Sequence, residues 1–115
     1  MVRRSTLLAL LLVAACSKGP EADLAYIGQA RSLAAEWALV NRQAAVGKLT
    51  DHYVTTMRQQ LRQQLQTVSS ALTQPDSRYG LEIHALLTQP DDADPEELRS
   101  HADKLKQIED GLESA

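Results

Sequence analysis

The chain has few of the residues that build chemical sites. Its 115 residues include one cysteine, three histidines and no phenylalanine, and only 3% of them are aromatic. A single cysteine excludes an intrachain disulfide framework and the cysteine-rich zinc motifs. With 12 Lys+Arg against 15 Asp+Glu, the net charge of −3 does not favour a nucleic-acid partner held by charge. At this length we expect one domain at most.

The usual catalytic motifs are also missing. The sequence contains no G-x-S-x-G, no glycine-rich phosphate loop and no candidate cysteine nucleophile other than Cys16. His52, His84 and His101 belong to no H-E-x-x-H or Cys/His set, so a metal site would have to draw on three separate helices. A haem site like that of helical haem bundles would need Met57 with His101, but such bundles place their methionine near the start of the first helix. We therefore predict no enzyme activity, no metal and no cofactor.

The first residues have the pattern of a targeting segment. Arg3 and Arg4 precede an apolar run over 7–15 that ends in small residues, and no acidic residue occurs before Glu21. This pattern is typical of a secretory signal. Nine apolar residues are too few to span a bilayer, which needs about 20. We predict that residues 1–15 are a signal peptide that is removed.

The residues that follow the apolar run are Val13-Ala14-Ala15-Cys16. This segment resembles the lipobox of bacterial lipoproteins, which implies cleavage before Cys16, diacylglycerol on its sulfur and acylation of the new amine. Several acyl chains hold a protein at a membrane far better than one. Ordinary secretion is the alternative, but it would leave a free thiol in an oxidising compartment. Ser17 stands where Asp would imply inner-membrane retention, so the resemblance implies the outer membrane, facing the periplasm.

The segment 16–20 is then a lipidated cysteine with a short tether, and 21–115 is the domain. The tether contains Gly19 and Pro20 and reaches roughly 15 Å when extended. The domain is therefore expected close to the membrane. Without Arg3 and Arg4 its net charge is −5.

The apolar residues after Glu21 recur at helical spacing. Tyr26, Ala30, Leu33 and Trp37 are separated by 4, 3 and 4 residues, which predicts one face of a helix that ends before Gly47. No segment has the pattern of a strand. The further helices are predicted over 51–74, with Thr50 as N-cap and Pro75 as stop, over 76–88, and from Pro95 onward, with Asp94 as N-cap.

These elements predict an all-α fold. We expect a small antiparallel helical bundle, made of a long helical hairpin plus two shorter helices. The alternative is an open hairpin that a second copy completes, because the alanine-rich first helix permits close helix approach.

Two short repeats lie at surface positions. Leu72-Thr73-Gln74-Pro75-Asp76 recurs fifteen residues later as Leu87-Thr88-Gln89-Pro90-Asp91. We interpret these segments as two helix ends stopped by proline, with a repeated recognition loop as the alternative. Arg58-Gln59-Gln60-Leu61 is repeated at once over 62–65, which indicates a solvated helix face or, as the alternative, a polar docking face.

Charge is uneven along the chain. Residues 42–66 have a net charge of +3, whereas 91–115 contain nine acidic residues and a net charge of −6. The simpler interpretation is that the two regions pair within the molecule. The acidic helix could instead bind a basic partner, and the basic turn could contact anionic head groups.

The sequence thus predicts a small lipid-anchored cell-envelope protein that acts by protein–protein contact, as an accessory subunit, adaptor or inhibitor. The alternative is a structural envelope lipoprotein that acts by self-association, for example as a homodimer. Such lipoproteins attach to peptidoglycan through a C-terminal lysine, whereas this chain ends Glu113-Ser114-Ala115. Periplasmic binding of a small ligand or a metal is a third, less favoured reading.

Overall fold

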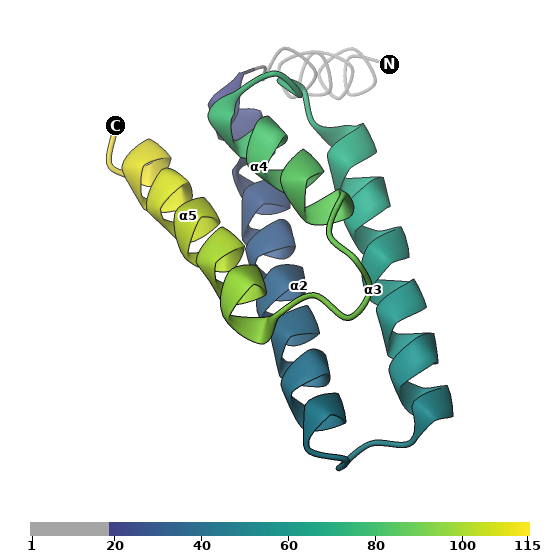
Figure 1. The fold of residues 1–115 in the computed structure, drawn as a ribbon. Coiled ribbons are helices and arrows are strands. Elements are labelled where there is room, and N and C mark those ends of the chain that lie inside the picture. Colours follow the sequence, from purple (N-terminus) through teal and green to yellow (C-terminus); the bar gives the residue numbers. More distant parts are fainter. Residues whose placement is uncertain (1–18) are drawn as a thin grey trace, which may run out of the picture.

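The computed structural model describes residues 19–115, and this part of the chain contains helices and no strand. The all-α prediction is therefore confirmed. The four helices are α2 Pro20–Ala45, α3 Asp51–Ala71, α4 Arg78–Leu87 and α5 Pro95–Glu113 (Figure 1).

Helix α2 lies at the centre of the bundle and contacts the other three helices. Helices α3 and α5 flank α2 without touching each other, and the short α4 bridges them. Helices that follow one another in the chain run antiparallel, and the turn between α2 and α3 extends beyond the part of the hairpin that α4 and α5 cover (Figure 1). The arrangement is the predicted small antiparallel bundle, although α5, with 19 residues, is almost as long as α3, with 21.

The predicted starts of α3 and α5 are confirmed by their caps. The Thr50 hydroxyl accepts a hydrogen bond from the Tyr53 N–H at 3.2 Å. The Asp94 carboxylate accepts one from the Glu96 N–H at 3.2 Å, and Pro95 occupies the first helical position. These caps satisfy N–H groups that lack a partner within the helix.

The structure differs from the predicted bounds around Pro75. Helix α3 ends at Ala71 instead of Gln74, because the N–H groups of Thr73 and Gln74 bond to a side chain of α2. Helix α4 begins at Arg78 instead of Asp76, with Ser77 as its N-cap. The local sequence signals the stop at proline but not the earlier exit from the helix.

The core is a single cluster of apolar side chains from all four helices. The apolar residues at helical spacing along α3, Val54, Leu61, Leu65 and Val68, lie in it, whereas Met57 packs against it partly buried and Tyr53 is exposed. Each large side chain buried in this way contributes about 1.5–3 kcal/mol. The fully buried large apolar side chains are Trp37, Ile27, Leu61, Leu65, Ile83, Leu86, Leu98 and Leu105.

At two positions the backbone geometry explains why the residue is glycine. Gly47, after α2, has φ +71°, as the predicted C-terminal position of a helix commonly requires. Gly80 costs helix propensity, but a Cβ there would lie 2.2 Å from the Pro75 carbonyl oxygen. The close packing of α4 on the preceding loop therefore requires glycine.

Candidate functional site

Cys16, the predicted lipid attachment residue, lies outside the described residues. The described chain enters α2 at Pro20, so only 17–19 separate Cys16 from the first helix. Pro20, the start of α4 and the last turns of α5 line one shallow pocket and so lie at the same end of the bundle. The α2–α3 turn lies at the opposite end (Figure 1).

A buried carboxylate holds the α3–α4 loop at the end of the bundle where α2 begins. The side chain of Asp23, in the first turn of α2, is fully buried. It accepts hydrogen bonds from the Thr73 N–H at 2.9 Å, the Thr73 hydroxyl at 3.0 Å, the Gln74 N–H at 3.1 Å and the Tyr79 hydroxyl. Four donors compensate for the loss of water around a buried charge. We call this set the Asp23 clamp.

The clamp sets the ionisation of both acidic partners. Burial by itself raises the pKa of Asp23, but the hydrogen bonds from Tyr79, Thr73 and Gln74 outweigh it and hold the pKa below 3.8. Burial, together with the bond to Asp23, raises the pKa of Tyr79 above 10.0. Asp23 is therefore an anion at neutral pH, and its oxygens accept hydrogen bonds from donors of this chain. We assign it a structural role.

A second clamp of opposite polarity holds the α4–α5 loop. Arg62 donates to the Leu87 and Gln89 carbonyl oxygens, each at 2.8 Å, and to the Asp91 carboxylate at 2.8 Å. Its guanidinium also lies over the Trp37 ring, 5.2 Å from the centroid. We call this set, with the two side chains described next, the Arg62 clamp.

Two side chains of α2 complete the Arg62 clamp. Trp37 Nε1 donates to the Asp91 carbonyl oxygen at 2.9 Å. Asn41 Nδ2 donates to the Asp91 and Ala93 carbonyl oxygens at 3.1 and 2.8 Å, while its Oδ1 accepts from Arg58 Nε at 2.9 Å. Both arginines of the repeated Arg-Gln-Gln-Leu segment therefore bond within the molecule. Sequence reasoning missed this role, and only the glutamines form the polar surface it expected.

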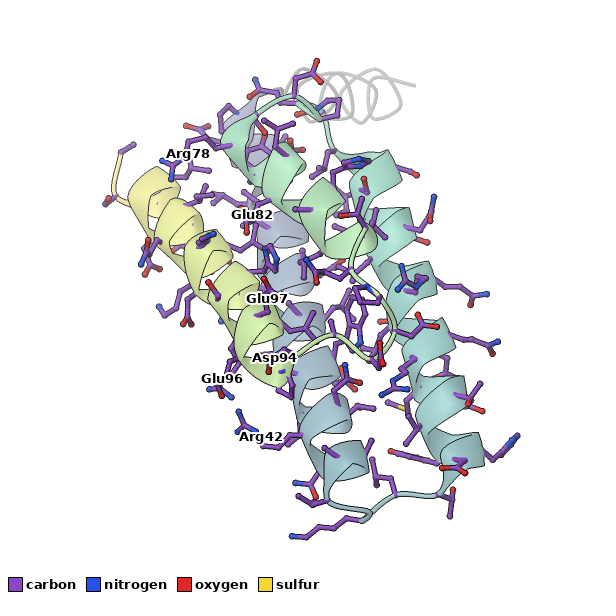
Figure 2. The ribbon with its side chains drawn as sticks, viewed as in Figure 1. Arg42, Arg78, Glu82, Asp94, Glu96 and Glu97 are labelled. Carbon is purple, nitrogen blue, oxygen red and sulfur yellow. The ribbon has the colours of Figure 1, made fainter. Side chains whose placement is uncertain are left out.

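Ion pairs join the basic and acidic regions, as the simpler interpretation of the charge pattern predicted. Arg42 pairs with Glu96 at 2.8 Å at the start of α5 (Figure 2), and Arg62 pairs with Asp91. Arg31 of α2 pairs with Glu109 at 3.1 Å. Exposed pairs of this kind stabilise little by themselves. Arg31–Glu109 and Arg42–Glu96 join α2 to α5 near the two ends of α5.

The three histidines are not brought together. His101 Nδ1 lies 2.5 Å from Glu82 Oε1 and links α5 to α4, whereas His52 and His84 are exposed on other helices. Within 19–115 no three His, Cys, Asp or Glu side chains are grouped closely enough to hold a metal ion. Met57 and His101 lie on α3 and α5, two helices that do not touch, so the structure does not assemble that haem pair.

An open groove of about 750 Å³ runs between α2 and α3. Gln29, Arg31 and Ser32 line it from α2, and Gln63, Gln64 and Thr67 line it from α3. Arg31, the one charged residue of the lining, is paired with Glu109 of α5. Residues two apart on a helix point about 200° apart. Gln64 therefore points away from the side of α3 on which Arg62 reaches the α4–α5 loop, and the groove belongs to the face that α4 and α5 leave open.

This face consists of two parallel rows of exposed or half-buried side chains, each with spacings of 4 and 3. We call the two rows the α2/α3 face. The row on α2 is Ala25, Gln29, Ser32, Glu36, Leu39 and Gln43, and Val46 continues it. The row on α3 is Tyr53, Met57, Gln60, Gln64, Thr67 and Ala71.

The α2/α3 face is poor in charge and ends in apolar side chains. Glu36 is its one charged residue. Leu39, Val46 and Tyr53, which are 54%, 63% and 48% exposed, lie toward the α2–α3 turn. Depletion of charge with enrichment of apolar and aromatic side chains is the composition of protein–protein interfaces.

Comparisons with protein-family models, with curated proteins and with solved structures find no match to this chain. The fold and surface therefore define its class only as a small all-α bundle with one charge-poor two-helix face. In the part described, none of the helices combines the length and apolarity needed to cross a membrane.

Proposed function

We propose that this chain is a small lipid-anchored protein of the bacterial cell envelope that acts by protein–protein contact, as an accessory subunit, adaptor or inhibitor. The observation that carries the contact part is the α2/α3 face, which is exposed, nearly uncharged and partly apolar. The lipobox-like Val13-Ala14-Ala15-Cys16 supports the anchor, most simply in the outer membrane facing the periplasm.

The fold is compatible with work near a membrane surface. The short segment 17–19 keeps the start of α2 near the anchor, while α2 itself is about 39 Å long. The apolar end of the α2/α3 face lies at the far end of this helix, so it can reach partners that project from the membrane. The same distance disfavours contact of the basic turn with nearby head groups when the bundle stands upright.

Self-association is the second candidate function. It is favoured by the same face, because two rows with 4-3 spacing suit packing against other helices. An envelope role through contacts between copies needs no further partner.

A crosslinking pull-down from intact cells of the native host tests the proposal. C-terminally tagged chains with Cys16 intact, with Cys16→Ala and with Ser32→Arg are compared, and captured proteins are identified by mass spectrometry. A discrete envelope complex, captured by the intact chain and lost with either substitution, supports the proposal. Equal capture by all three chains contradicts it. Ser100→Arg, at an exposed serine of α5, is the control for an added positive charge.

A further inference from the structure

We infer that the α2/α3 face binds a second copy of this chain, in a parallel two-fold dimer whose anchors enter the same membrane. The inference rests on the proposed function, since it uses the lipid anchor, and it names the occupant of the same face. The result is a four-helix arrangement of two stacked hairpins, in which α2 of one copy packs on α3 of its partner.

Charge makes the α2/α3 face better suited to a second copy of this chain than the exposed side of α5 is. The domain is acidic, and α5 carries six acidic residues against Arg99, Lys104 and Lys106, a net charge of −3. Two identical acidic faces repel each other. Glu36 is the one charge on the α2/α3 face, and it lies level with Gln60, because the antiparallel helices join at 46–50. In the two-fold pair, Glu36 therefore meets an amide.

The size of the face is also sufficient. Two helices of about 30 Å, each about 10 Å wide, offer on the order of 600 Å² per copy. Two such faces bury on the order of 1,200 Å², at the lower limit of stable specific interfaces. Confinement to one membrane plane raises the effective concentration of the copies and favours association further.

The anchor decides the orientation. Cys16 precedes α2 by a few residues, so anchors in one membrane place both α2 N-termini on the same side. Parallel copies bring Leu39, Val46 and Tyr53 of one chain beside those of the other. This contact covers three of the four large apolar side chains that are exposed in the described chain. An antiparallel pair would separate the anchors by the length of α2.

Single-cysteine crosslinking of the full chain in its native envelope tests both the partner and the orientation. Cys16 is the only cysteine, and lipidation removes its thiol, so one added cysteine is the only reactive group. Gln29→Cys near the anchor and Val46→Cys near the turn are treated with a short bismaleimide. Asp103→Cys, exposed on α5, is the collision control, and the parent chain tests whether Cys16 is blocked.

The dimer predicts that both face cysteines link the chain to itself at least tenfold more than Asp103→Cys does. Adding Ser32→Arg to Val46→Cys should reduce this product at least tenfold while the circular-dichroism melting curve stays the same. Equal products from all three positions overturn the inference, as does no product when a mono-maleimide labels every site. Products from neither end but from Glu36→Cys overturn the parallel orientation.

The outcomes separate this inference from the proposed function. Adducts of the face cysteines with a different protein overturn the second copy as occupant but support contact through the face. Absence of any adduct, together with an unchanged pull-down from Ser32→Arg cells, overturns both.

Discussion

The same five residues, Leu-Thr-Gln-Pro-Asp, occur at the ends of α3 and α4 and are held in opposite ways. In the first copy, Asp23 accepts hydrogen bonds from the N–H groups of Thr73 and Gln74. In the second copy, Arg62 donates to the carbonyl oxygens of Leu87 and Gln89. One loop is bound by an anion through its donors, and the other by a cation through its acceptors.

The difference teaches that tertiary partners decide the conformation of these loops. After Leu72 the chain leaves the helix at once, because Asp23 takes the N–H of Thr73. After Leu87 the chain keeps helical geometry for one more residue, and the Thr88 N–H bonds to His84 and Ala85 carbonyl oxygens. The proline stops both helices, but the clamp sets where each one ends.

Removing Asp23 is expected to have the largest effect. Asp23→Ala leaves two backbone N–H groups and the Tyr79 hydroxyl without their acceptor in a buried site, so the free energy of unfolding should fall by about 3–4 kcal/mol. Urea unfolding followed by circular dichroism measures it. Asp76→Ala, an exposed carboxylate in the same loop, should change stability by less than about 0.5 kcal/mol. A loss below about 1 kcal/mol for Asp23→Ala would show that the clamp is not needed.

Removing Arg62 comes next. Arg62→Met keeps the apolar stem but loses the bonds to two carbonyl oxygens and the stacking on Trp37, which should cost about 2 kcal/mol. Trp37 is the only tryptophan, so native-state fluorescence reports this clamp alone. Its emission should shift in Arg62→Met and stay unchanged in Asp23→Ala. The two losses should add in the double variant because the clamps share no residue, and strong non-additivity would contradict two independent clamps.

Local signals in the sequence predicted most of the fold. The 4-3 apolar spacing and the caps at Thr50 and Asp94 depend on neighbours within a few residues, and these helix starts are confirmed. The clamps join residues 50 or 25 positions apart, such as Asp23 to Thr73 and Arg62 to Leu87. A pattern of residues within one helix or turn cannot predict a hydrogen-bond partner that lies so far away in the sequence.

The candidate face had a signal that sequence reasoning left unused. Between Tyr53 and Gln74 the only charged residues are Arg58 and Arg62. Once the structure turns both toward Asn41 and the α4–α5 loop, the exposed side of α3 has almost no charge. Whether the exposed side of α3 is charged or charge-poor depends on where the Arg58 and Arg62 side chains point. That direction is set by the packing of α4 and α5, which the local sequence does not contain.

The Asp23 clamp should also make stability depend on acid, because the acceptor at its centre is a buried carboxylate. The pKa of folded Asp23 lies below its usual 3.8, so its contribution is present above pH 3.8 and is lost as pH falls through the folded pKa. Tyr79→Phe removes one donor, which should cost about 1.5 kcal/mol. It should also raise the folded pKa of Asp23 and move the acid limb of the stability profile to higher pH. Arg62→Met removes none of the hydrogen-bond donors of Asp23, so it should lower the profile without moving the limb that Asp23 sets. Parallel profiles for all three proteins would contradict the assignment.

The smallest expected effect compares the same threonine in the two segments. Thr73 donates its hydroxyl proton to Asp23 at 3.0 Å, whereas Thr88 donates to the carbonyl oxygen of Ala85, within its own helix end, at 2.8 Å. Valine keeps the shape of threonine but has no hydroxyl. Thr73→Val should therefore cost about 1 kcal/mol, because it removes a donor to a buried charge, and Thr88→Val should cost less than about 0.5 kcal/mol. Both side chains are exposed at their loops, so burial does not explain a difference. Equal losses in urea unfolding would mean that the identical segments share one local role, and the distinction between the two clamps would then not extend to their threonines.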